Sequence, residues 1–214
     1  LPETIPAEYL KETKRYTKHV ALSGKTISDA AKQMLSKKEK DWFDISTLKE
    51  PFRVEGKKTL GYEIAEQLGW QLPDVIIYET GGGTGLIGMW KAFVELKSIG
   101  RIKGRLPRMV AAQSNGCAPV VDAFQRLKNS TDFWENSNTI ALGLNVPGPL
   151  GGHWILDILY QSDGIAIAVP EKDLETLTKE FVATTGINAG PEAGVVWGAY
   201  NTLKDISWIK PDES

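Results

Sequence analysis

Short, almost wholly apolar runs alternate along the chain with longer segments that are apolar on one side only. Runs at 74–78, 109–113 and 164–169 have the length and content of strands that are covered on both faces. Two more runs, at 19–22 and 139–144, are also predicted as strands. Apolar spacing and helix-forming composition predict helices over 7–16, from 27 onward, and over 56–68, 86–98, 117–127, 150–160, 171–184 and 193–203.

Strand and helix segments follow one another through short connections, which is typical of an α/β fold with a largely parallel sheet and right-handed crossovers. The stretch 43–53 has no periodic pattern and is predicted to be irregular. The charged run 37–40 is predicted to be a solvated helix end. No internal repeat and no low-complexity segment interrupts this alternation.

The positions of the glycines are the strongest indication of a binding site in this sequence. The chain has 21 glycines, more than an average usage of ~7% would give. They gather within 81–88, 143–152 and 186–198, each time beside a periodic apolar segment. A flexible linker would instead be rich in glycine and serine throughout, so these clusters indicate shaped loops in a folded domain.

The first cluster, 80–85, lies between a predicted strand and the predicted helix 86–98. Successive glycines let backbone N–H groups converge, and the N-terminus of a helix favours an anion. The carboxyl end of a parallel strand is also where open α/β sheets bind ligands. The loop is therefore predicted to hold a phosphate, with the Thr84 hydroxyl as an added donor; the alternative is a tight turn without a ligand.

Two other phosphate-binding patterns agree less well with the residues of this loop. The P-loop requires lysine directly after its last glycine, and Lys91 lies too far along the helix. Gly83, Gly85 and Gly88 match the letters of the dinucleotide fingerprint, which stays as an alternative. Where that fingerprint expects an acidic residue, about 20 residues on, the chain has a basic stretch at 103–105.

Composition narrows the class of protein further. A formal net charge of −2 gives no basic field for nucleic acid. A single cysteine excludes an internal disulfide and favours a cytoplasmic compartment. One cysteine and two histidines are too few to supply the four ligands of the usual zinc sites. The longest apolar stretch, 139–156, is broken by proline and glycine, so no membrane helix is expected. No signal peptide is evident, and because Leu1 is not an initiator methionine we expect sequence upstream.

The segment 78–93 resembles the phosphate-binding loop and helix of the threonine-synthase-like group in the fold type II (tryptophan synthase β-like) pyridoxal-phosphate family. The segments that continue this resemblance, in order along the chain, are 26–32, 56–66, 116–124, 146–150 and 186–197. The resemblance implies a three-layer α/β fold with an open, mostly parallel sheet, and pyridoxal 5'-phosphate as cofactor. In the family's pattern the cofactor phosphate would be held by Gly81, Gly82, Gly83, Thr84 and Gly85.

Glu192 stands in the segment that, by resemblance, closes the cofactor pocket. It would either face the pyridine nitrogen and favour a protonated ring, or serve as an acid at a helix N-terminus. Glu79 departs from the family, which often has proline there. Because a carboxylate repels a phosphate, Glu79 is expected to point away or to pair with a cation.

The family's Schiff-base lysine lies before anything matched here, so this chain resembles the carboxyl-terminal half of the enzyme and has no catalytic residue of its own. Lys91 is expected to be structural or exposed, and Lys57 and Lys58 to be solvated in a basic turn. Cys117 is expected to pack near the loop, and His153 to lie at the surface or to cap a helix.

The resemblance implies a pyridoxal-phosphate-dependent lyase or synthase of threonine biosynthesis that converts O-phosphohomoserine to threonine and phosphate, as a homodimer. Residues 1–45 would be the remnant of a smaller amino-terminal domain, and 46–214 the larger domain that binds the cofactor phosphate. The alternatives are another pyridoxal-phosphate-dependent dehydratase or ammonia-lyase, and a non-catalytic phosphate- or nucleotide-binding module.

Overall fold

A computed structural model describes residues 1–214, which form two compact units, Leu1–Asp44 and Ile45–Ser214. The first unit holds helices α1 (Ala7–Tyr16) and α2 (Ile27–Lys37), neither of which has a buried residue. Thr26 and Asp29 form a capping box at the start of α2, each side chain binding the other's backbone N–H.

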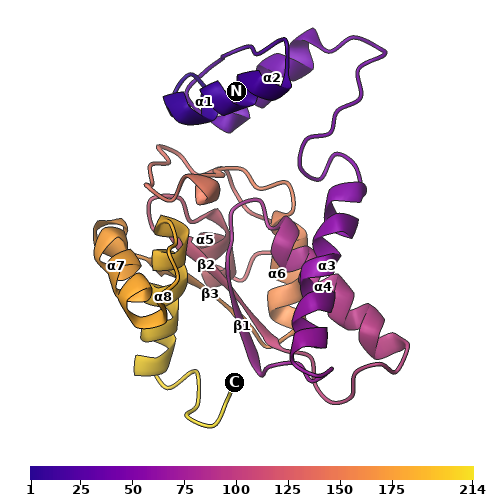
Figure 1. Cartoon of the computed structure of the whole chain (residues 1–214), viewed down its shortest axis with the longest axis vertical. Coiled ribbons are helices and arrows are strands. Elements are labelled where there is room, and N and C mark those ends of the chain that lie inside the picture. Colours follow the sequence, from indigo (N-terminus) through magenta and orange to yellow (C-terminus); the bar gives the residue numbers. More distant parts are fainter. The chain divides into compact units, whose positions relative to one another are not determined.

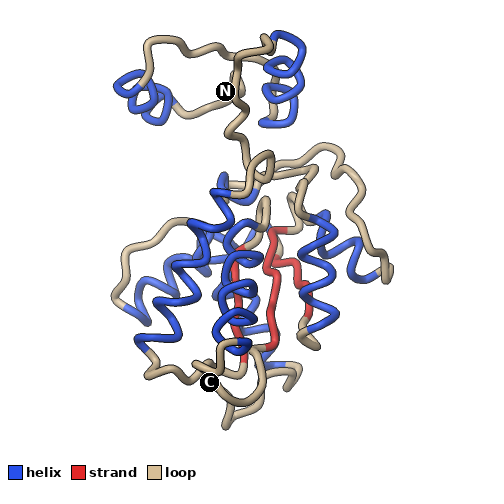
Figure 2. The backbone as a smooth tube through the Cα atoms, turned by 90° about the vertical axis from the view of Figure 1, so that its right-hand side faces the viewer, coloured by secondary structure: helices blue, strands red, loops and turns tan.

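The second unit is built on a three-stranded parallel sheet in the order β1-β2-β3 (Figures 1 and 2). Tyr78 of β1 pairs with Ala111 of β2, and Ala112 of β2 pairs with Ile167 of β3. The strands are β1 (Val75–Glu79), β2 (Arg108–Ser114) and β3 (Ile165–Val169). The three principal strand predictions and the parallel sheet are thus confirmed.

Helices cover both faces of this sheet, which gives the three layers expected for the fold (Figure 1). Met109 of β2 packs on one face with Phe93, and Ala112 packs on the other with Val195. One face carries α3 (Phe52–Gln67), α4 (Thr84–Ser98), α5 (Pro119–Gln125) and α6 (Gly152–Gln161); the other carries α7 (Leu174–Thr185) and α8 (Pro191–Asp205). Short 3₁₀ turns occupy Leu142–Leu144 and Glu171–Asp173.

Two strand predictions are wrong. Residues 139–144 end in a 3₁₀ turn, because the N–H groups of Ile140 and Gly143 donate to the carboxylates of Glu171 and Glu192 rather than to a strand. Strand β2 pairs directly with β3, so the sheet has no place for another strand between them. Residues 19–22 form no strand either, and only isolated backbone bonds join this region to Leu1.

The start of α3 also differs from the prediction. The helix begins at Phe52, inside the stretch expected to be irregular, because the Glu50 carboxylate accepts the N–H groups of Phe52 and Arg53. None of the helices has both the length and the apolar character needed to cross a bilayer.

Candidate functional site

The glycine loop, residues 80–83, joins the carboxyl end of β1 to the N-terminus of α4 (Figure 1). The helix begins at Thr84, two residues earlier than predicted, so Thr84 and Gly85 belong to its first turn. No side chain caps this end and no acidic residue lies in the first turn. The first helical hydrogen bond is from the Ile87 N–H to the Gly83 carbonyl, 2.9 Å. The earlier N–H groups are therefore free to bind an anion.

Two glycines of the loop are required by the protein's own packing. Gly83 has a φ of 83°, in the left-handed region, and a Cβ there would collide with Ile155. A Cβ on Gly81 would lie 2.6 Å from the carbonyl oxygen of Gly143. At Gly82, by contrast, a Cβ would meet only the Thr47 methyl group, at 3.5 Å. Gly82 is thus the point where the loop backbone stays open to a ligand.

Gln113 holds the residue that leads into the glycine loop. Its side chain is fully buried, and its Nε2 donates to the carbonyl of Thr80 at 2.9 Å. Its Oε1 accepts the N–H groups of Val120 and Val121, at 2.9 and 3.2 Å, at the start of α5. Gln113 is not among the residues predicted for the site, although a glutamine at the end of an otherwise apolar strand is a signal that could have identified it.

Glu192 lies in the first turn of α8, where its Oε1 accepts the N–H of Gly143 at 2.9 Å. Gly143 in turn packs its carbonyl against Gly81. The carboxylate therefore holds the 142–144 turn against the glycine loop. Glu192 also stands at the N-terminus of α8, as in the alternative expectation of an acid at a helix N-terminus.

Asn145, beside this turn, carries the one buried side-chain atom without a hydrogen-bond partner, its Oδ1. Its neighbours Leu144 and Val146 pack against Gly81, with atoms 3.3 and 3.2 Å from where a Cβ would stand. A buried acceptor without a donor costs free energy unless a ligand satisfies it. Sequence reasoning missed Asn145, since nothing in the sequence shows that its amide is buried.

Glu79 ends β1 directly before the loop and makes no ion pair. Burial raises the pKa of its carboxyl, and the negative charge of Glu192 raises that pKa further. The nearby Lys57 cation opposes this upward shift of the pKa. The carboxyl therefore takes up a proton at a higher pH than a solvated glutamate does, and this change was not among the expectations of an outward orientation or a cation partner.

The lysines assessed from the sequence lie on α3 and α4. Lys57 and Lys58 are inside α3, so the predicted basic turn is wrong. Lys58 is not solvated either: its Nζ lies 2.6 Å from Glu55 and 2.9 Å from Glu95. These carboxylates raise the pKa of Lys58, and Lys91 also pairs with Glu55. Lys58 and Lys91 are thus engaged in ion pairs between the two helices.

Cys117 and His153 contribute no reactive group at the loop. Cys117 is buried, and burial raises the pKa of its thiol to about 11, which disfavours the nucleophilic thiolate. His153 is an exposed residue in the first turn of α6, with its ring beside that of Trp154. Packing for the cysteine and a surface position for the histidine agree with expectation.

The dinucleotide alternative fails on geometry. The basic stretch 103–105 precedes β2 and so lies at the amino ends of the strands, away from the glycine loop. A ribose-binding acid would have to lie at the carboxyl end of β2, where the chain has Ser114 and Asn115. Gly88 serves helix packing instead, because a Cβ there would lie 2.8 Å from the Cβ of Lys57 on α3.

The profile of the family described as "Pyridoxal-phosphate dependent enzyme" matches residues 1–214. The chain belongs to this family. Its cofactor is therefore pyridoxal 5'-phosphate, as the resemblance implied.

Relatives and solved structures agree with the family. The chain is 32% identical to a threonine synthase of Methanocaldococcus jannaschii and 30% identical to one of Methanosarcina acetivorans, over 76% and 77% of its length. It spans 40% of each of these relatives. An L-serine ammonia-lyase from Rhizomucor miehei shares the fold, with a TM-score of 0.80 at 17% identity over 100% of this chain and 64% of that one.

The residues present fit the phosphate group of this cofactor. An uncapped helix N-terminus without an acidic residue in its first turn suits a dianion. Gly82 leaves room for its approach. We call this part of the second unit the glycine-loop site. It consists of the glycine loop, the 142–146 segment and Glu192.

Replacing Gln113 by leucine is expected to lower the free energy of unfolding by ~3 kcal/mol or more. The change leaves the Thr80 carbonyl and the N–H groups of Val120 and Val121 buried without partners. Urea denaturation measures the loss. Gln125→Leu, at an exposed position on α5, is the matched control and is expected to change stability little; equal effects of the two variants would contradict the assigned role.

Replacing Glu79 by glutamine is expected to flatten the dependence of stability on pH. A carboxyl whose pKa is raised by folding stabilises the folded state most below its ordinary pKa, and that contribution is lost as pH rises through the raised value. Glu79→Gln should therefore be more stable than the parent at alkaline pH. Denaturation at several pH values tests this, with the exposed Glu66→Gln as control; parallel curves for parent and Glu79→Gln would refute it.

Proposed function

We propose that this chain is the cofactor-phosphate-binding part of a threonine-synthase-like enzyme, which converts O-phosphohomoserine to threonine and phosphate. The observation that carries the proposal is the glycine loop on the uncapped N-terminus of α4, open at Gly82. The likeness to two archaeal threonine synthases supports the choice of reaction.

In this proposal the main-chain N–H groups of residues 81–85 and the Thr84 hydroxyl hold the cofactor phosphate. Glu192 keeps the 142–144 turn against the loop through Gly143, and so shapes one wall of the site. Glu192 would also be the acid of the closing segment that faces the cofactor's pyridine nitrogen and favours its protonated form. When bound, pyridoxal phosphate withdraws electrons from the α-carbon of an amino-acid substrate.

The nucleophilic lysine belongs, in this proposal, to an amino-terminal half that is not part of this chain. Lys58 and Lys91 are engaged with Glu55, and Lys58 also with Glu95, so neither offers a free amine to the loop. Residues 1–45 would be the remnant of the smaller domain and 46–214 the larger, cofactor-holding domain. The complete enzyme would act on a small amino-acid substrate as a homodimer.

The variant Gly82→Asp tests the phosphate site without disturbing the fold. Its side chain has room, but it brings a carboxylate to the place where the phosphate would lie. The affinity for pyridoxal phosphate, followed by absorbance, should fall by about a hundredfold. Gly56→Asp, at a helical position with no atom within 4 Å of a Cβ, is the control and should bind like the parent. Unchanged binding in Gly82→Asp, with circular dichroism intact, would overturn the assignment.

Borohydride reduction tests the absence of the lysine. The chain is incubated with pyridoxal phosphate, reduced, and examined by mass spectrometry for a pyridoxyl group. Reversible binding without a site-specific adduct is expected. A specific adduct on one lysine of this chain would show that it carries its own nucleophile.

Activity distinguishes the proposed reaction from its relatives. An assembly of this chain with an amino-terminal half of the family should release phosphate from O-phosphohomoserine and form threonine. Release of ammonia from serine or threonine, without action on O-phosphohomoserine, would replace the proposal by the dehydratase or ammonia-lyase alternative. Tight nucleotide binding with no action on any amino acid would favour the non-catalytic module.

A further inference from the structure

The side chain of Tyr78 ends at the first turn of α4. Tyr78 lies on β1, shortly before the glycine loop, and it packs against the core cluster that contains Leu86 and Phe93 of α4. A Cβ on Gly85, in the first turn of that helix, would collide with the phenol oxygen of Tyr78. The hydroxyl therefore reaches this turn only because residue 85 has no side chain.

The hydroxyl lies on the side of this turn that faces the helix N-terminus. In an α-helix every Cα–Cβ bond is tilted towards the N-terminus, and the Tyr78 oxygen lies close to where a Cβ on Gly85 would be. The N–H groups of the first turn, which have no helical partner, point to the same end of the helix. A hydroxyl from β1 is thus added to the donors at the end of α4 where the phosphate is proposed to bind.

The hydroxyl of Tyr78 has no hydrogen-bond partner in the protein, whereas those of Tyr62 and Tyr160 bind a carboxylate and a backbone carbonyl. Because Asn145 Oδ1 is the one buried side-chain atom without a partner, the Tyr78 oxygen is open to solvent. Burial raises the pKa of Tyr78, and the negative charge of Glu79 raises it further. The hydroxyl therefore keeps its proton at neutral pH and can donate it to a ligand.

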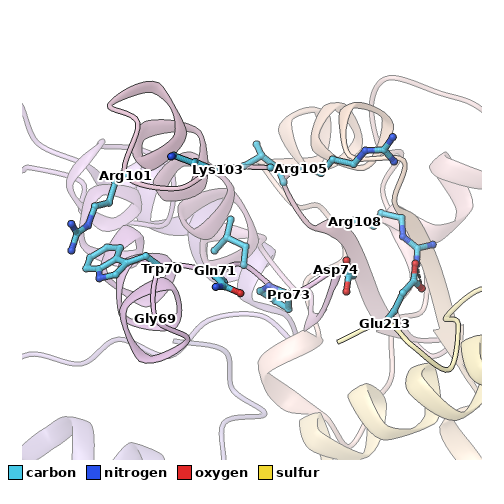
Figure 3. Close-up of a pocket in the computed structure, with 13 residues that line it drawn as sticks. Gly69, Trp70, Gln71, Pro73, Asp74, Arg101, Lys103, Arg105, Arg108 and Glu213 are labelled. Carbon is cyan, nitrogen blue, oxygen red and sulfur yellow. Dashed lines mark hydrogen bonds and ion pairs between the residues drawn. The ribbon is translucent and has the colours of Figure 1, made fainter.

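Strand β1 is held at both ends, which fixes the position of Tyr78. At the amino end, Asp74 accepts the backbone N–H and the hydroxyl of Ser214, each at 3.1 Å. The neighbouring strand β2 is tied to the same C-terminal segment through the ion pair of Arg108 (Figure 3). At the carboxyl end, the Gln113 amide binds the first carbonyl of the glycine loop at 2.9 Å. A donor on a strand fixed in this way loses little conformational freedom when a ligand binds.

We propose that Tyr78 is a further binding residue of the glycine-loop site, whose hydroxyl donates a hydrogen bond to an oxygen of the cofactor phosphate. This inference rests on the proposed function, which puts the phosphate of pyridoxal phosphate at the loop. A hydrogen bond to an anionic oxygen is roughly twice as strong as one between neutral groups. Gly85 and Tyr78 then act as a pair, in which the glycine leaves the space and the strand supplies the hydroxyl.

The variant Tyr78→Phe tests this role, because it removes the oxygen and keeps the ring in the core. The dissociation constant for pyridoxal phosphate, followed by absorbance, should rise about tenfold. The ³¹P resonance of the bound cofactor should shift as well. Tyr200→Phe, at a half-buried tyrosine of α8 without a hydrogen bond, is the matched control and should bind like the parent.

Two results would overturn the proposal. The first is an affinity of Tyr78→Phe equal to that of the parent. The second is weaker binding with an unshifted ³¹P resonance, which would show that the hydroxyl does not touch the phosphate.

The variant Gly82→Asp separates a failure of this inference from a failure of the proposed function. If Gly82→Asp loses the cofactor while Tyr78→Phe binds like the parent, the phosphate lies at the loop and Tyr78 does not hold it. If the parent does not bind pyridoxal phosphate, or Gly82→Asp binds it unchanged, the proposed function fails and the role of Tyr78 fails with it.

Discussion

The three hydrogen bonds of the Gln113 side chain are the constraint on which the glycine-loop site depends. They join the end of β1, the end of β2 and the start of α5 in a place without water. A backbone carbonyl and two N–H groups would be buried without partners if the Gln113 amide were absent. Because Thr80 is held in this way, the glycines that follow leave β1 in one direction only, towards the N-terminus of α4.

A second set of contacts then shapes the site from the far side of the sequence. Glu192, on the last helix, binds the N–H of Gly143, and Gly143 lies against Gly81. The 142–144 turn therefore lies outside the sheet and forms one wall of the glycine-loop site. Burial raises the pKa of Glu79, and the negative charge of Glu192 raises it further. Charge around the loop is thus controlled by residues that are more than a hundred positions apart.

Much of the fold could be predicted because its signals are local. The strands at 74–78, 109–113 and 164–169 are short apolar runs, and parallel strands covered on both faces require such runs. The run at 139–144 has the same composition, yet its N–H groups are taken by Glu171 and Glu192. Local composition could not reveal those partners. The ion pairs of Lys58 could not be predicted for the same reason. Its charged segment indicated a solvated lysine, but the packing of α3 on α4 places its amine between two glutamates.

By itself, the sequence determined the α/β alternation, the glycine loop between strand and helix, and the membership of a pyridoxal-phosphate family, because each is written in contiguous residues. Only the tertiary structure decided which glycine stays open, which carboxyl has a raised pKa and which acceptor lacks a donor. These properties depend on burial and on distances between segments far apart in the chain, which no local pattern encodes.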